Sequence, residues 1–347
     1  MINFIRWLLL PVSFLYACIV WIRNRLYDHH LLKSTSFNLP VVVIGNLAVG
    51  GTGKSPMTEY LLRILSPARD ITVLSRGYGR TTKGFHEVSA TDNASQSGDE
   101  PLQIKRKFPE TAVVVCEDRV KGIRQIQHDT QGVLLDDAYQ HRALRPSFAI
   151  LLFDYSSLLT PRFPLPTGNF RDDLRESKRA NIIVVNKCPA DLDASVKFQL
   201  TAKLRAFSQA EIFFAKIAYD RLTSIDGQYF PEESLAETAV LLVTGIANPK
   251  PLYDHLSSRV KSLHQIAYRD HHQFTDHDQQ RIVEKLNSMP AIGQKVIITT
   301  EKDIQRFPAG FLTEYPIYFP PINPEILFNE APVFENMVKK AFGKREV

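Results

Sequence analysis

The chain has 347 residues, of which 44% are hydrophobic and 23% are charged, and its formal net charge is +5. The apolar content excludes an intrinsically disordered chain, and at the usual ~100–200 residues per domain the length predicts two domains. The basic excess suits partners that carry phosphate or an anionic membrane face, but it is too diffuse to indicate a nucleic-acid partner.

The N-terminal segment is apolar between basic flanks. Residues 7–22 contain no charged side chain, Arg6 precedes them, and Arg23 and Arg25 follow. The run is short for a membrane-spanning helix, which needs about 20 apolar residues, and no signal-peptide cleavage site follows it. Its aromatic residues and flanking arginines favour a helix at a membrane surface or inserted shallowly into it. A first helix buried against the domain is one alternative, and a spanning helix or a signal peptide is another.

Short apolar runs alternate with helix-length amphipathic segments from residue 39 onward. Most of the runs are rich in β-branched residues and apolar at both parities, as in strands that are buried on both faces of a parallel sheet. They lie at residues 41–44, 71–74, 112–116, 133–135, 148–153 and 182–185. This is the βαβ pattern of an α/β fold.

A hairpin signal separates this pattern from a second one. Asp226-Gly227 lies between two apolar stretches and is typical of a tight β-turn, and a new alternation of strands and helices begins near residue 240. The sequence therefore predicts an N-terminal helix at 1–34, an α/β domain at 35–211, a β-hairpin linker at 212–235 and a smaller α/β domain at 236–347.

A glycine-rich turn, named here the phosphate loop, follows the first predicted strand. It consists of Ala48, Val49, Gly50, Gly51, Thr52, Gly53, Lys54 and Ser55, and a helix is expected from Pro56. Glycines allow backbone N–H groups to surround a phosphate, and the helix N-terminus adds its dipole. Lys54 is expected to reach the β- and γ-phosphates of a nucleotide and Ser55 to ligate Mg²⁺. Ala48 stands where the strict motif has glycine, so an ordinary glycine-rich turn is the alternative.

Polar residues close two other predicted strands. Asp136 and Asp137 follow the strand at 133–135, where a carboxylate can hold the Mg²⁺ of a bound nucleotide, and a surface turn is the alternative. Asn186-Lys187 resembles the start of a guanine-reading Asn-Lys-x-Asp, but Pro189 occupies the fourth position. We therefore expect Asn186-Lys187 to be a strand end near the nucleotide rather than a guanine reader.

Further polar clusters lie at expected strand ends and loops, where α/β folds place their sites. They are Ser75–Gly79, Gly98–Pro101, Asp136–His141, Arg171, Gly245–Pro249, Asp270-His271 and Thr300–Asp303. Together with Gly45–Ser55, this ordered set resembles the tetraacyldisaccharide 4′-kinases, the lipid A 4′-kinases. Ala138 replaces the family's usual glycine after the Asp pair, and Asp172 replaces its usual glutamate; neither change removes a charge.

The resemblance implies an enzyme of lipid A (lipopolysaccharide) biosynthesis. Such a kinase uses ATP and Mg²⁺ to phosphorylate the 4′-hydroxyl of an acylated glucosamine disaccharide 1-phosphate. The implied architecture is a P-loop kinase-type parallel-sheet domain and a smaller α/β domain, with a cleft between them that closes on ATP. The implied location is monotopic or peripheral, at the cytoplasmic face of the inner membrane. We expect a monomer with no nucleic-acid partner.

The resemblance also implies roles for single residues. Lys54 and Asp137 belong to the catalytic set, and Asp99 receives the hydroxyl proton, oriented or relayed by His271. For Asp99 the structural alternative is a helix N-cap, and for His271 it is an ordinary surface histidine. Arg76, His141 and Arg171 are candidates for binding phosphate or substrate, or are simply solvated loop side chains.

Two other classes of protein stay open. One is a P-loop GTPase or metallochaperone-like NTPase, against which the misplaced guanine signal and the lack of His/Cys clusters in the sequence argue. The other is a non-catalytic nucleotide-binding scaffold, against which the set of Lys54, Ser55 and the Asp pair argues.

The expected pairing of Asp99 with His271 is testable by a double-mutant cycle. Asp99→Ala and His271→Ala should each lower kcat by about 10²–10⁴ at saturating Mg-ATP, the usual scale for loss of a general base. The double variant should be little slower than the slower single variant, because members of one catalytic unit are not additive. Fully multiplicative losses would show that the two residues act independently.

Overall fold

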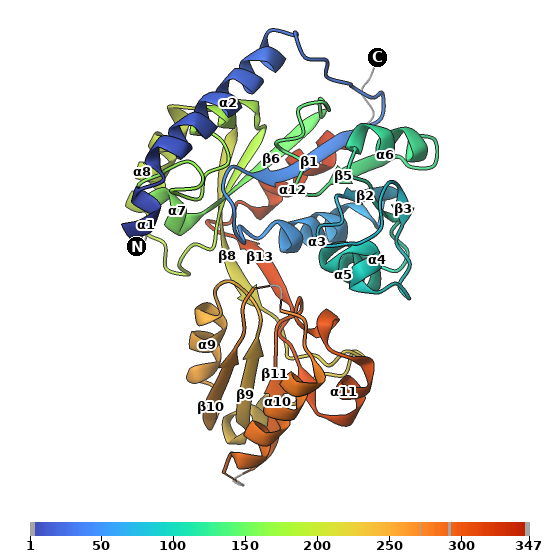
Figure 1. Ribbon diagram of the computed structural model, residues 1–347, viewed down its shortest axis with the longest axis vertical. Helices are drawn as coiled ribbons and strands as arrows, with labels where there is room; N and C mark the ends of the chain where they lie inside the picture. Colours follow the sequence, from blue (N-terminus) through green and yellow to red (C-terminus); the bar gives the residue numbers. More distant parts are fainter. Residues whose placement is uncertain (1–3, 271, 291–292, 344–347) are drawn as a thin grey trace. The chain divides into compact units, whose positions relative to one another are not determined.

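The computed structural model describes residues 4–270, 272–290 and 293–343 (Figure 1). The chain divides into two compact units, Met1–Ile217 with Pro324–Val347 and Ala218–Asn323. Each unit is built around its own mostly parallel sheet with helices packed on both faces, which confirms the predicted α/β class.

The large sheet places β1 at its centre. In sheet order its strands are β13 (Ile322–Ile326), β8 (Glu211–Tyr219), β7 (Ile182–Asn186), β6 (Phe148–Asp154), β1 (Val41–Asn46), β5 (Gly132–Leu135), β2 (Ile71–Ser75), β4 (Val113–Val115) and β3 (His86–Glu87). β1 pairs in parallel with β6 on one side and β5 on the other, with Val42 opposite Phe148 and Leu134. Since parallel strands end at one edge, the polar residues that follow them gather there.

Successive residues of β1 point into two separate cores. Val41 and Val43 pack on one face of the sheet, and Val42 and Ile44 pack on the other. The first face is covered by α6 (Arg119–Ile126), α7 (Tyr155–Leu159) and α8 (Ala194–Arg205), and the second by α3 (Lys54–Leu65), α5 (Asp99–Lys107) and α12 (Ala331–Ala341). Short helices at α4 (Ala94–Ser97) and Leu174–Arg179 complete the connections.

The second unit repeats this plan on a smaller scale. Its sheet order is β10 (Ser262–Ala267), β9 (Ala239–Thr244), β11 (Lys295–Ile298) and β12 (Ile317–Tyr318), all parallel. α9 (Lys250–Ser257) covers one face, and α10 (Asp276–Ser288) and α11 (Ala309–Glu314) cover the other. Short 3₁₀ turns occur at Glu232–Glu237 and Ile304–Arg306.

The region expected to be a linker hairpin differs from that expectation. Residues 212–219 form most of β8, which pairs in parallel with β7, because Phe213 and Phe214 are buried in opposite cores of the large sheet. The Asp226-Gly227 signal closes only a short turn between Thr223 and Tyr229. The chain then returns to the first unit through β13 and α12, which had been expected to belong to the second domain.

The N-terminal segment forms α1 (Phe4–Trp7) and α2 (Leu10–Asp28). A row of large apolar side chains of this segment is exposed: Trp7, Leu8, Leu9, Leu10, Val12, Phe14, Leu15, Ile19, Trp21 and Ile22. Its polar Ser13 and Asn24 are buried instead, and they bond to Thr167 and Asp172 of the first unit. Within the part of the chain that the structure describes, no helix combines the length and hydropathy of a membrane span.

Candidate active site

The phosphate loop connects β1 to α3 and requires glycine at two positions. Gly50 has φ +114° and Gly53 has φ +86°, both in the region that side chains disfavour. A Cβ atom on Gly53 would also lie only 2.2 Å from the side-chain amide nitrogen, Nδ2, of Asn186. α3 begins at Lys54, so the positive end of the helix dipole lies at the loop.

Two buried asparagine amides hold the loop through Thr52. Asn46 Nδ2 donates to Thr52 Oγ1 at 2.9 Å, and Asn186 Nδ2 donates to the Thr52 carbonyl oxygen at 3.0 Å. Asn46 was not among the residues expected from the sequence, although a polar residue that ends an otherwise apolar strand is a usable signal. Because buried amides are costly without partners, these bonds fix the shape of the loop in advance of any ligand.

Lys54, Asp137 and Arg171, all expected site residues, lie together beside the loop. Lys54 Nζ is 3.7 Å from Asp137 Oδ1, and Arg171 Nη2 is 3.1 Å from the same oxygen. Burial alone would raise the pKa of Asp137, but the Lys54 ammonium and the Arg171 guanidinium outweigh it and hold the pKa below its usual value. The cluster therefore keeps a charged carboxylate next to the phosphate loop.

Asp136 has the opposite environment. Its side chain is buried, Oδ1 accepts a hydrogen bond from Thr58 at 3.4 Å, and Oδ2 is buried without a hydrogen-bond partner. Burial, followed by the charge of Glu100, raises the pKa of this carboxyl. A buried carboxylate with an unsatisfied oxygen is destabilising unless a cation or a donor completes it.

The Asp pair and Ser55 fit a magnesium ion that is shared with a nucleotide. Mg²⁺ prefers oxygen ligands and is usually held by one or two carboxylates together with substrate phosphates. Over the described ranges, no three His, Cys, Asp or Glu side chains are grouped so that they could hold a metal ion by themselves. The unsatisfied Oδ2 of Asp136 is the atom that such an ion would complete.

Arg76 and His141, both expected to bind substrate, interact electrostatically with another basic residue, Arg119. Burial lowers the pKa of His141 and the Arg119 charge lowers it further, while burial and then the Arg76 charge lower that of Arg119. Arg119 Nη2 donates to the Asp137 carbonyl oxygen at 3.3 Å, which joins this group to the Asp pair. Arg119 was missed in the sequence, although it closely follows an expected strand.

Asp99 is the first residue of α5, and Gly98, not Asp99, occupies the N-cap position. A Cβ atom on Gly98 would lie 3.0 Å from the Tyr78 carbonyl oxygen, so the loop after β2 packs directly on this helix start. The charge of Glu100, the next residue of this helix start, contributes to the raised pKa of Asp136. His271 lies outside the described residues, and its pairing with Asp99 stays a prediction.

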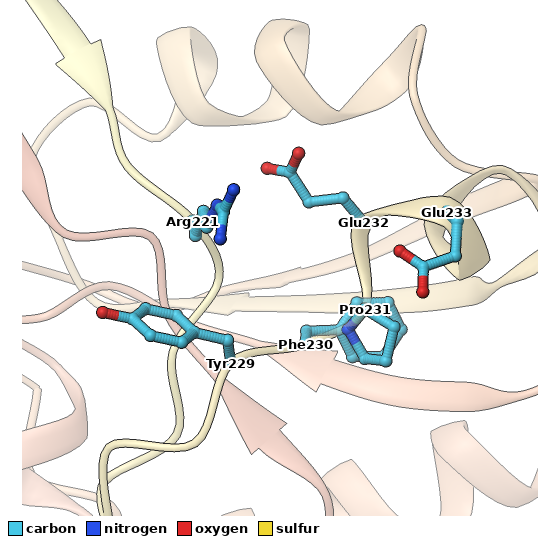
Figure 2. Close-up of a pocket in the computed structure, with 6 residues that line it drawn as sticks. All are labelled: Arg221, Tyr229, Phe230, Pro231, Glu232 and Glu233. Carbon is cyan, nitrogen blue, oxygen red and sulfur yellow. The ribbon is translucent and has the colours of Figure 1, made fainter.

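Two surface cavities of the described structure are further candidates for a ligand site. One, of about 290 Å³, is lined by Arg76–Lys83 and Glu117, and Arg80 forms a 2.6 Å ion pair with Glu117 at its wall. Figure 2 shows the other, of about 260 Å³, in the second unit; its lining residues are Arg221, Tyr229, Phe230, Pro231, Glu232 and Glu233. The second cavity contains no expected site residue, so we assign the chemistry to the phosphate-loop region.

Comparison with known proteins yields one consistent family. The family model for tetraacyldisaccharide-1-P 4′-kinase matches residues 5–342. A tetraacyldisaccharide 4′-kinase of Flavobacterium johnsoniae is 41% identical, with 92% of each chain covered. One of Bacteroides thetaiotaomicron is 36% identical over 98% of this chain and 96% of its own. The crystal structure of LpxK from Aquifex aeolicus in complex with ATP superposes with a TM-score of 0.77 at 27% identity, covering 98% of this chain and 100% of that one.

The two-amide support of the phosphate loop predicts a stability effect. Asn186→Ala leaves the Thr52 carbonyl without its donor, and should lower the free energy of unfolding by about 1–3 kcal/mol. Denaturant unfolding of the full chain measures this. Asn287→Ala, at an exposed position of α10, is the control and should change stability little. Equal stability of Asn186→Ala and wild type would show that the amide does not support the loop.

Proposed function

The chain belongs to the tetraacyldisaccharide-1-P 4′-kinase family and is an ATP-dependent kinase of lipid A biosynthesis, and we propose that phosphoryl transfer takes place at the phosphate loop and the Asp pair. The observation that carries this assignment is the contact of Lys54 and Arg171 with one oxygen of Asp137. It combines a cationic phosphate site with a charged carboxylate, which phosphoryl transfer requires.

ATP is held by the phosphate loop in this proposal. Lys54 would contact the β- and γ-phosphates, and Ser55, Asp136 and Asp137 would hold the accompanying Mg²⁺. When bound, that ion neutralises charge on the phosphates. Lys54 stabilises the negative charge of the transferring phosphoryl group, since it is already positioned by Asp137 and needs little reorganisation.

The acceptor hydroxyl needs a base as attack develops. Asp99 fills this role in our proposal, because it opens α5, whose next residue, Glu100, interacts electrostatically with Asp136. His271 would orient Asp99 or relay its proton. Arg171 completes the cluster: its guanidinium donates to Asn46 Oδ1 and to Asp137, with a quarter of its side chain still exposed to a ligand.

The cations Arg76 and Arg119, together with the neutral imidazole of His141, would bind the anionic head of the acceptor. Burial next to Arg119 lowers the pKa of His141, so at neutral pH this imidazole is uncharged and can donate or accept a hydrogen bond. Its buried Nε2 has no hydrogen-bond partner, which leaves an atom available to a sugar or phosphate group. The substrate in this proposal is the acylated glucosamine disaccharide 1-phosphate.

The exposed apolar row of α1 and α2 would bind the membrane. We place it peripherally on the cytoplasmic face of the inner membrane, where the acyl chains of the substrate remain in lipid and a monomer meets the sugar head. The opposite face of α2 supports the site: Tyr16 donates to the Arg171 carbonyl oxygen at 3.0 Å, and Arg23 donates to that of Gln140 at 2.8 Å. In this proposal one face of α2 contacts the membrane, and the other face holds the loops that carry Arg171 and Gln140.

Removal of the Lys54 charge tests the phosphate-loop assignment. Lys54→Ala should lower kcat by about 10²–10³, the scale of losing one transition-state donor. The assay is transfer of labelled phosphate from Mg-ATP to tetraacyldisaccharide 1-phosphate. Lys216→Ala removes a partly exposed lysine whose Nζ lies 3.0 Å from Glu325, and serves as the control with near-normal kcat. A near-normal rate for Lys54→Ala would contradict the assignment.

Charge on the apolar row tests the membrane proposal. Phe14 is 73% exposed, and Phe14→Glu should weaken binding to anionic lipid vesicles by about tenfold or more, the effect of losing one buried aromatic ring. Vesicle sedimentation measures this, while ATP affinity should not change. Tyr229→Glu, at a 65% exposed aromatic residue of the second unit, is the matched control. Equal sedimentation of the two variants would refute the proposal.

A further inference from the structure

Lys187 lies at the edge of the phosphate loop, although the function described above gives it no role. It follows β7 directly, with φ +60°, and its backbone N–H donates to Asn186 Oδ1 at 2.8 Å. Its Nζ is the nearest atom to a Cβ placed on Gly51, at 4.0 Å. The side chain therefore approaches the part of the loop that carries adjacent glycines.

Asp154 fixes the position of this lysine. Lys187 Nζ is 3.0 Å from Asp154 Oδ2, and the other carboxylate oxygen of Asp154 accepts hydrogen bonds from the backbone and hydroxyl of Ser156. Asp154 closes β6 and caps α7, so it is well anchored. An ion pair with Lys187 one-third exposed contributes little to stability, but it holds an ammonium group and its apolar stem at a defined place.

The strand order shows which part of a nucleotide would pass Lys187. The sheet runs β7, β6, β1, β5, and the Asp pair follows β5. Lys54 and Arg171 meet Asp137 on that side of β1, so the terminal phosphates belong there. Lys187 follows β7, beyond β6 on the opposite side of β1, which is the direction in which the rest of a nucleotide that crosses the loop would extend.

We infer that Lys187, held by Asp154, contacts the nucleoside part of ATP and is a nucleotide-positioning residue of this kinase. Its stem packs against the ribose and base, and its ammonium donates to a ribose oxygen. The contact does not require guanine, because Pro189 stands where a guanine-reading aspartate would be. The inference rests on the phosphate-loop ATP site proposed above.

The test compares ligands with and without a nucleoside. Dissociation constants of ATP, ADP and inorganic tripolyphosphate are measured with Mg²⁺ on the full-length protein. Lys187→Met keeps the stem length but removes the charge, and should weaken ATP and ADP equally, by about tenfold, and leave tripolyphosphate unchanged. Lys187→Arg should restore most of the affinity. In the kinase assay Lys187→Met should raise the KM for ATP with little change in kcat.

Two controls separate this inference from the site on which it rests. Lys216→Met removes a lysine with the same 3.0 Å ion-pair distance and a similar exposure, 27% against 33%, and should change no affinity. Lys54→Met should weaken both ATP and tripolyphosphate. If it weakens neither, the phosphate-loop site itself is wrong. If Lys54→Met weakens both ligands while Lys187→Met weakens neither, or weakens tripolyphosphate as much as ATP, only the nucleoside contact is wrong.

Discussion

The side chain and carbonyl of Asn46 connect the parts of the site to one another. Its Nδ2 donates to Thr52 of the phosphate loop, its Oδ1 accepts from Arg171, and its carbonyl oxygen accepts from Gln140 at 2.5 Å. The residue is fully buried at the end of the central strand, where it is also held by the pairing of β1 with β6. Buried polar groups of this kind fix one geometry, since each alternative leaves a donor or acceptor unsatisfied. The phosphate loop and the loops that carry Arg171 and Gln140 are therefore held in register by one residue, through its side-chain amide and its backbone carbonyl.

The adjacent carboxyl groups of Asp136 and Asp137 have pKa values shifted in opposite directions. Asp137 is partly exposed and meets two cations, whereas Asp136 is buried against Thr58 and near Glu100. One carboxylate is thus kept charged to orient Lys54, and the other gains most from a bound cation. A pair of equally solvated aspartates would hold the same charge but would not distinguish these two tasks. Their separation results from the strand end, which turns one side chain inward and leaves the next at the surface with φ +46°.

Much of this arrangement was predictable from the sequence because strand ends carry it. The runs at 41–44 and 133–135 predicted parallel strands, and a common edge then brings Lys54 near Asp137. The candidate role of Arg171 was implied by the family resemblance. The position of its loop is set by contacts that no local sequence pattern encodes, such as the hydrogen bond to Asn46. Local pattern also failed at 212–219, where a strand buried on both faces was read as a hairpin arm because of a later Asp-Gly turn. The partner of such a strand is set by pairing with residues far away in the sequence, and hydrophobic periodicity carries no information about that pairing.

The N-terminal helix shows how polar contacts can orient a short apolar segment on the first unit. In an entirely apolar helix no specific contact would fix its rotation about its own axis on the first unit. α2 has a polar edge that supplies such contacts. Ser13 bonds to Thr167, Asn24 bonds to Asp172, and Arg142 bonds to the Asn24 carbonyl oxygen. Because these buried bonds specify one orientation, the edge of α2 that carries Phe14, Leu15 and Ile19 is left exposed. The apolar row is thereby oriented by polar contacts on the opposite edge, and the loops that carry Arg171 and Gln140 are held against the same helix.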